Sequence, residues 1–393
     1  MSTISSVPFA EAPWLRGATS PYYNDSHLKW QQKCRNFITE NLSQHAVEWE
    51  KTGVVPSEVF QKFAAGNFLL PSLPPPLNVN ILKSLSRCGL SGIQGSLVTG
   101  MAFGVPPLLK FANEELQQDG GSDLSNILTT AEKSKDGGSY IVNGQKKWIT
   151  NGIWADYGTM LVRTGSAGPS GLSLLLVPLK GHPGVEMRKL AVSGAQTSGT
   201  TFIDLDNVIV PISNLIGKEG MGMKYTVTNF NHERISLAIT GTVQARVALS
   251  SAFAYTMKRE AFGKTLLDQP VVRHRIAKCG AELEALWALV EQVVHQLTSP
   301  SSADEGEVEI GAMAALAKVQ AGRVLDKCVR CAVLLFGGSG YTKSGQGELI
   351  EMLSREVHGP RIFGGSEDIL LDLAVRQLAK LYVKTSAGST SRL

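Results

Sequence analysis

The spacing of hydrophobic residues changes twice along the chain. In the first third, apolar positions recur every three or four residues, as around Trp30, Cys34 and Phe37, which is typical of amphipathic helices. Asp25 and Ser26 are placed to cap this helix, and Pro56-Ser57-Glu58 is expected to open another because proline favours a first helical turn. The prolines between residues 70 and 77 exclude a helix there, and an interruption is expected at 100–107.

Residues from about 119 to 215 follow a different pattern, rich in Gly, Ser, Thr and Val. Apolar and polar positions alternate over 139–142 and an apolar run covers 172–179, and both patterns indicate strands. Two more strands are predicted at 200–205 and 208–210. A turn is expected at Gly137-Gly138 and a hairpin turn at Asn143-Gly144, because Asn-Gly readily takes positive φ. This part of the chain is predicted to be a β domain.

Helical spacing returns after the connector Gly217–Gly222, which lacks the glycine spacing of a phosphate-binding loop. Long helices are predicted at 227–258, 269–298, 308–335 and 366–383. The order of helices, strands and helices predicts an α+β protein. Its expected parts are an N-terminal helical domain (1–118), a middle β domain (119–222), a C-terminal four-helix domain (223–384) and a flexible tail (385–393).

Composition narrows the class of protein. Hydrophobic residues make up 43% and charged residues 18% of the 393 residues, as in folded soluble proteins. The net charge of +4 does not favour nucleic acid, but it suits a substrate that carries phosphates. No apolar run is long enough to span a membrane. Cys328 and Cys331 form a CxxC in an apolar helical stretch, so we expect buried thiols in a reducing compartment and no metal site.

The segment Trp148-Ile149-Thr150 carries the first candidate chemistry. It lies at a predicted strand end, just before Asn151-Gly152. An indole face and a hydroxyl suit a planar ligand, since one stacks and the other forms a hydrogen bond. On pattern alone, a solvent-facing β-meander is the favoured interpretation of the same residues.

Residues 119–152, DGGSDLSNILTTAEKSKDGGSYIVNGQKKWITNG, closely resemble the middle domain of the acyl-CoA dehydrogenases. The resemblance implies an acyl-CoA dehydrogenase-like fold, FAD as cofactor and an acyl-CoA thioester as substrate. It also implies that Trp148, Ile149 and Thr150 hold the flavin and that Ser122 lies near flavin and thioester.

Two C-terminal motifs extend the resemblance. Arg259-Glu260-Ala261-Phe262-Gly263-Lys264 with Gln269 resembles a family loop whose Arg and Gln reach the FAD of a neighbouring subunit, which implies a homodimer or homotetramer. Gly337 and Gly338 match a segment where the backbone approaches FAD, although Leu334 replaces the usual Gln. Gly365, Ser366 and Glu367 also align with flavin-binding positions.

The catalytic base is expected on an unusual helix. Most of the family carries a Glu where this chain has Gly364, but isovaleryl-CoA and long-chain acyl-CoA dehydrogenases place it in a Glu-Arg pair elsewhere. Glu233-Arg234 resembles that pair, so Glu233 is the predicted base, with Arg234 and Asn231 as substrate-binding residues. The alternative is that Glu233 is an ordinary surface acid of a helix.

Two family segments are absent: a strand before Asp119 and a glycine loop near 78–80. The chain ends in Ser391-Arg392-Leu393, a close variant of a peroxisomal address read by an import receptor. The predicted function is α,β-dehydrogenation of an acyl-CoA to its trans-2-enoyl form, in fatty-acid oxidation or a specialised pathway. The electron acceptor is an electron-transfer flavoprotein or, as in acyl-CoA oxidases, oxygen. A catalytically silent relative that binds CoA esters or partner subunits is the non-enzyme alternative.

Overall fold

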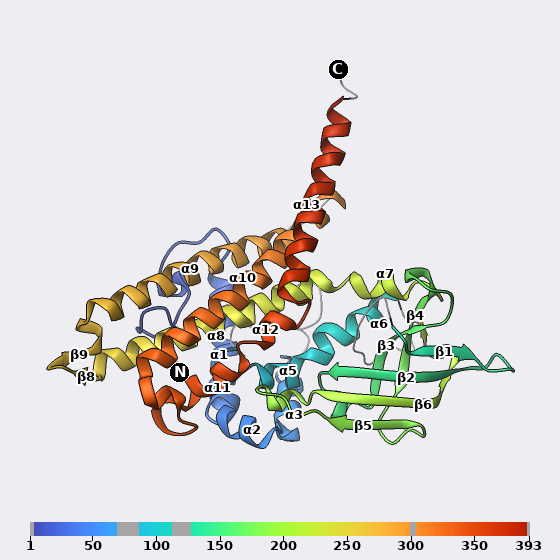
Figure 1. Ribbon diagram of the computed structural model, residues 1–393, viewed down its shortest axis with the longest axis horizontal. Coiled ribbons are helices and arrows are strands. Elements are labelled where there is room, and N and C mark those ends of the chain that lie inside the picture. Colours follow the sequence, from blue (N-terminus) through green and yellow to red (C-terminus); the bar gives the residue numbers. More distant parts are fainter. Residues whose placement is uncertain (1–3, 69–85, 112–126, 299–303, 391–393) are drawn as a thin grey trace. The chain divides into compact units, whose positions relative to one another are not determined.

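The computed structural model describes residues 4–68, 86–111, 127–298 and 304–390 (Figure 1). Its contacts group into two compact units. Unit 1 contains Met1–Val47, Leu77–Ser91 and Arg234–Leu393, and unit 2 contains Glu48–Pro76 and Gly92–Glu233. Residues 1–118, expected to be a separate helical domain, are therefore shared between the two units. The division after Glu233 falls inside one long helix.

Unit 2 is built around a seven-stranded sheet (Figure 1). The strand order is β5-β6-β2-β1-β3-β4-β7, and neighbours are antiparallel except β1 and β3. This confirms the predicted β domain. The strands are β1 (Thr130–Lys133), β2 (Ser139–Ile149), β3 (Tyr157–Arg163), β4 (Leu172–Pro178), β5 (Val185–Lys189), β6 (Thr201–Pro211) and β7 (Leu215–Ile216).

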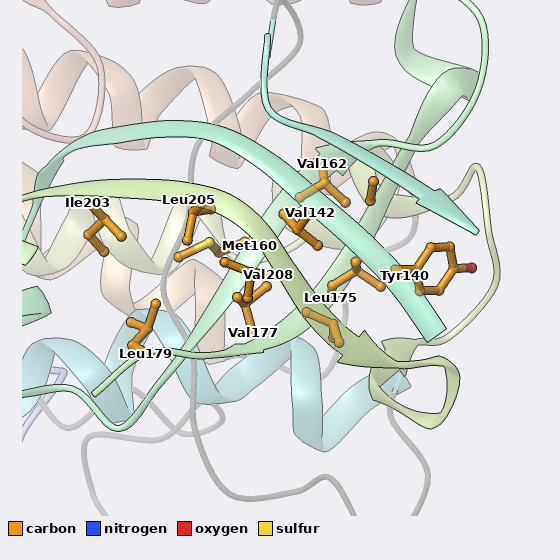
Figure 2. Close-up of a cluster of buried hydrophobic side chains, with 12 residues drawn as sticks. Tyr140, Val142, Met160, Val162, Leu175, Val177, Leu179, Ile203, Leu205 and Val208 are labelled. Atoms are coloured by element: carbon orange, nitrogen blue, oxygen red, sulfur yellow. The ribbon is translucent and has the colours of Figure 1, made fainter. Parts of the chain in front are cut away.

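The core of unit 2 lies on both faces of β3 and β4. On one face, side chains of β2 and β6 meet those of β3 and β4, among them Val142, Val177 and Ile203 (Figure 2). On the other face, Leu108 of α6 (Val105–Phe111) and Tyr225 of α7 (Gly222–Val227) pack against the sheet. Burial on two faces explains why 172–179 is a continuous apolar run and not an alternating one.

The expected hairpin at Asn143-Gly144 is wrong. β2 continues through it, and the register with β6 shifts between Val142 and Gly144. β6 is irregular at the same place, because Asn207 has a φ of 52° and its backbone N–H donates to the Asn143 side chain. Two irregularities facing each other keep both strands running, so the strands expected at 200–205 and 208–210 are one. The expected turn at Gly137-Gly138 is confirmed, with Gly137 at a φ of 71°.

The helices that precede the sheet in the sequence lie close to the predicted positions. α1 (Asp25–Ile38) begins one residue after Asn24, which caps it in place of Asp25 or Ser26. α2 (Ala46–Thr52) and α3 (Ser57–Ala65) follow, and the proline expected to open α3 is its N-cap. α5 (Ser91–Thr99) runs through a π-helical turn at Gly100–Gly104 into α6. The expected interruption is therefore wrong, since prolines in the first turn of α6 need no backbone donor.

Unit 1 contains four long helices, as predicted: α8 (Phe230–Lys258), of which Arg234 onward belongs to this unit, α9 (Pro270–Thr298), α10 (Asp304–Phe336) and α13 (Glu367–Thr390). A hairpin, β8 (Glu260–Ala261) and β9 (Lys264–Thr265), follows α8, and α11 (Glu348–Glu356) and α12 (Gly359–Ile362) precede α13. α13 extends to Thr390, so a flexible tail from residue 385 is wrong as far as Thr390. A helix that has already formed propagates at little cost per residue. The described helices include none long and apolar enough to cross a bilayer.

All five cysteines are buried and free, which confirms that the CxxC residues are packed thiols. The thiols of Cys328 and Cys331 on α10 act on Cys279 of α9 and lower its pKa. The linear sequence could not show this third thiol, because it lies about 50 residues away on a different helix.

Candidate active site

Trp148 is displaced from the sheet of unit 2. Between Lys146 and Ile149 the register of β2 against β6 shifts, and Trp148 adopts a φ of 66°, which is unusual for an aromatic residue. Such a bulge turns a side chain away from its ladder position. The indole is 62% exposed, and the Lys147 ammonium lies 4.6 Å from its ring centroid. A large aromatic face is thus presented at the strand end where the sequence placed it.

Asn151 fixes the turn that follows Thr150. It has a φ of 65°, and its backbone N–H donates to the carbonyl of Ser198. Its side-chain amide donates to the carbonyls of Gly95 and Ser96 at 3.1 Å each. The turn is therefore tied to α5 within unit 2, and Ile149 and Thr150 are held half-buried beside Trp148. In the sequence Asn151 indicates only a turn, because its bonds to α5 join residues more than 50 positions apart.

The start of α8 carries the predicted base. Asn231 and Glu233 are half-buried in its first turn, and the backbone N–H of Glu233 donates to the carbonyl of Asn229. Asn229 in turn donates to the carbonyl of Ala102, which anchors this helix end in unit 2. A carboxylate in a first turn is favoured by the helix dipole. Ser122 lies outside the described residues, as do both expected missing segments.

The glycine in the usual position of the base lies against α8 in unit 1. Gly364 has a φ of 65°, and a Cβ atom on it would come within 2.5 Å of Leu237 Cδ1. Leu237 follows Glu233 by four residues, so the two side chains share one face of α8. Arg234, on a neighbouring position, is buried with 8% exposure.

Glu367 is held by two guanidinium groups. Its carboxylate pairs with Arg323 at 2.7 Å and with Arg361 at 2.8 Å. The hydrogen bond from Arg361, followed by that from Arg323, lowers the pKa of Glu367 and keeps it ionised. The buried Lys318 donates a hydrogen bond to the carbonyl of Gly365, in the same segment. In the sequence, the only indication of a buried lysine here is its place within the apolar run AALAKVQAG.

Arg259 and Gln269 flank the β8–β9 hairpin of unit 1. Arg259 is exposed, Gln269 is half-exposed, and Phe262 between them is 95% exposed at a φ of 56°. Gly337 and Gly338 are also exposed, and a Cβ atom on either would meet nothing within 4 Å. Gly337 has a φ of 59°, which by itself favours glycine, but neither packing nor a positive φ requires glycine at position 338. Close approach of another molecule is a reason for Gly338.

The chemistry of these residues, taken one by one, suits the parts of a flavin dinucleotide. An exposed indole beside a hydroxyl suits the flavin ring, and an exposed guanidinium with an amide suits a pyrophosphate. The open backbone at Gly337-Gly338 suits a ligand that lies against the chain. Glu367 fits less directly, because its carboxylate already pairs with Arg323 and Arg361.

Comparison with known proteins decides the family. Three family models match consecutive parts of the chain: the N-terminal (24–120), middle (115–208) and C-terminal (220–379) domains of acyl-CoA dehydrogenase. The chain belongs to the acyl-CoA dehydrogenase family. As an acyl-CoA dehydrogenase family enzyme it is an oxidoreductase, and the resemblance, fold class and enzyme class predicted from sequence are confirmed.

Acyl-CoA dehydrogenase apdG of Emericella nidulans is 55% identical over 427 aligned residues, covering 97% of each chain. That alignment is longer than this chain, so the relative has residues with no counterpart here. Acyl-CoA dehydrogenase AFT10-1 of Alternaria alternata is 33% identical over 96% of each chain. The crystal structure of acyl-CoA dehydrogenase from Geobacillus kaustophilus is 28% identical with a TM-score of 0.81, over 92% of this chain and all of that one.

Proposed function

We propose that this acyl-CoA dehydrogenase oxidises the Cα–Cβ bond of an acyl-CoA to the trans-2-enoyl-CoA, with Glu233 as the base and FAD as the cofactor. The observation that carries the proposal is the arrangement on α8. Glu233 shares a helix face with Leu237, and Leu237 fills the space beside Gly364, where most of the family places its base.

Glu233 removes the proton from Cα, and the helix dipole favours a carboxylate at this position in the first turn of α8. Arg234 and Asn231, one and two residues away, bind and orient the CoA ester. Trp148, Ile149, Thr150, Arg259, Gln269, Gly337, Gly338, Gly365 and Ser366 would hold FAD, with Ser122 near the thioester. When bound, FAD supplies the acceptor for the hydride that leaves Cβ.

A flavin spectrum and substrate bleaching test the proposal. The purified protein, reconstituted with FAD, should be yellow and should bleach when acyl-CoAs of different length and branching are added without oxygen. Glu233→Gln should keep the flavin and lower the bleaching rate by about 10²- to 10⁴-fold, the usual contribution of a general base. Glu132→Gln, the same change at an exposed site on β1, should bleach like the wild type.

Each alternative has its own outcome. Bleaching that survives in Glu233→Gln would assign the base elsewhere. A colourless protein that takes up no FAD would instead support the silent CoA-ester-binding relative. For the electron acceptor we propose an electron-transfer flavoprotein, and rapid oxygen consumption during turnover would favour an acyl-CoA oxidase instead.

Because the Arg259 hairpin is exposed and serves a neighbouring subunit in the family, the proposal includes a homodimer or homotetramer.

We also propose a peroxisomal location, on the basis of Ser391-Arg392-Leu393. A fluorescent protein fused to the N-terminus should then collect in marked peroxisomes. The same fusion without residues 391–393 should spread through the cytosol, because the import receptor reads the terminal tripeptide. A fusion with the intact C-terminus that stays cytosolic would refute this location and leave the chemistry unaffected.

A further inference from the structure

Lys318 is a charged residue in the core of unit 1. It lies on α10 between the buried residues Ala317 and Val319, and only 1% of it is exposed. Its ammonium donates a hydrogen bond to the carbonyl oxygen of Gly365. A buried ammonium needs such a partner, because water no longer solvates it.

The carbonyl that accepts this hydrogen bond belongs to a pair of consecutive glycines, Gly364 and Gly365. Gly364 and Gly365 both have positive φ angles, 65° and 101°. Two consecutive glycines have wide conformational freedom, so one conformation persists only when contacts fix it. Leu237 lies where a Cβ atom of residue 364 would be, Leu370 lies where one of residue 365 would be, and Lys318 holds the carbonyl of Gly365.

Charges on two other elements act on this lysine. Arg234 of α8 repels the ammonium, and Glu367 at the start of α13 attracts it. Burial is the main cause that lowers the pKa of Lys318 to about 8, and Arg234 lowers it further. Glu367 acts in the opposite direction and raises this pKa. The arginines around it stay charged at any relevant pH, so Lys318 is the cation of this group that can lose its proton.

We propose that Lys318 is a positioning residue of the dehydrogenation site: its protonated ammonium fixes the Gly364–Ser366 segment beside Leu237 on the helix that carries Glu233. The proposal rests on the function proposed above. When Lys318 loses its proton, the bond to Gly365 is no longer charge-assisted and has roughly half its strength. The glycine segment then leaves its working conformation more often.

Steady-state kinetics between pH 6 and 10 test this role. In the wild type, kcat should fall as pH rises through about 8, because the protonated lysine is the active form. Lys318→Met should lower kcat about 10- to 100-fold with little change in KM, as expected for lost positioning. Lys318→Arg should restore most of kcat and lose the decline near pH 8. Lys327→Met, at a half-exposed lysine of the same helix that pairs with Glu282, should keep the wild-type profile.

Hydrogen exchange gives a readout that does not depend on turnover. At one fixed pH, a peptide covering residues 359–369 should exchange faster in Lys318→Met than in the wild type or Lys327→Met. If Lys318→Met fails to fold, Lys318→Gln provides the same comparison, because its amide still donates a hydrogen bond but carries no charge. Equal exchange in these variants and the wild type would overturn the positioning role.

The two proposals fail in different ways. A wild type that binds FAD but oxidises no acyl-CoA would remove the proposed function, while the exchange data would still report on Lys318. An active wild type, together with a Lys318→Met variant that keeps its kcat and the decline near pH 8, would refute the inference about Lys318 alone.

Discussion

Gly364 combines a backbone requirement with a steric one. At its φ of 65°, a side chain costs about 1–2 kcal/mol, and a Cβ atom would also lie within 2.5 Å of Leu237 Cδ1. Overpacking of this kind adds roughly 1–3 kcal/mol. Gly364→Ala should therefore lower the free energy of unfolding by about 2–5 kcal/mol, which urea denaturation of the purified protein would measure.

Leu237→Ala provides the matched control for the steric part. On the wild-type background it removes packing, but on the Gly364→Ala background it also relieves the contact with the new methyl group. The double variant should thus be more stable than the sum of the two single changes predicts, by about 1–3 kcal/mol. Strict additivity would show that Leu237 does not limit the side chain at position 364.

Single residues were predicted from sequence with uneven success. Trp148 was placed at a strand end, and the structure puts it there, exposed. Motif resemblance carried that prediction, because the pattern alone also allowed an ordinary β-meander. Lys318 was missed for a physical reason: its importance comes from burial and from contacts with residues 234, 365 and 367, which are distant in sequence.

Elements were easier to predict than their connections. The four long helices of unit 1 were located to within four residues, except that α13 ends seven residues beyond the predicted end, because a sustained apolar period fixes a helix. Turns depend on fewer residues. Asn143-Gly144 has the composition of a hairpin turn, yet the facing irregularity at Asn207 lets β2 continue past it. That pairing joins residues 64 positions apart, so no local pattern could reveal it.

The same difference applies to the helical segment 91–111. Glycine and proline near residue 104 are ordinary breakers, but a π-helical turn and a proline-tolerant first turn carry the helix through them. Local propensity therefore predicted a break in the helix. The packing of α6 against the sheet, where Leu108 is fully buried, stabilises the helix enough to overcome that propensity. At this helix, burial in the tertiary structure stabilises more than the low helix propensity of glycine and proline destabilises.

At the scale of the whole molecule, the predicted site residues are divided between the two units. Trp148, Thr150 and Glu233 belong to unit 2, whereas Arg234, Arg259 and Gly364 belong to unit 1. The hydrophobic pattern separated strands from helices, but it gave no reason to expect that residues so far apart in sequence belong to one site. That expectation came from family motifs, and the three matched domain models account for why it could be made.

Unit 1 also depends on a buried carboxylate near the start of the chain. Glu11 is fully buried and pairs with Arg35 at 2.7 Å and Arg87 at 3.0 Å. Arg246 of α8 donates to the carbonyls of Phe9 and Glu11, so this network joins the first residues to the helical bundle. Burial alone would raise the pKa of Glu11, but the hydrogen bond from Arg35 and the charge of Arg87 lead the effects that lower it.

Glu11→Gln should destabilise the protein by about 3–5 kcal/mol at pH 7, because Arg35 keeps its buried charge without a carboxylate. A folded-state pKa below the unfolded value of 4.5 means that the wild-type advantage is complete above pH 4.5. That advantage is lost as pH falls through the folded-state pKa, where Glu11 takes up a proton. Urea unfolding at pH 7, 5 and 4 would follow the loss.

Asp372→Asn is the control, because it breaks an exposed pair with Arg376. It should lower the free energy of unfolding by about 1 kcal/mol or less at every pH. An equally small effect of Glu11→Gln would show that the Glu11 network does not stabilise unit 1.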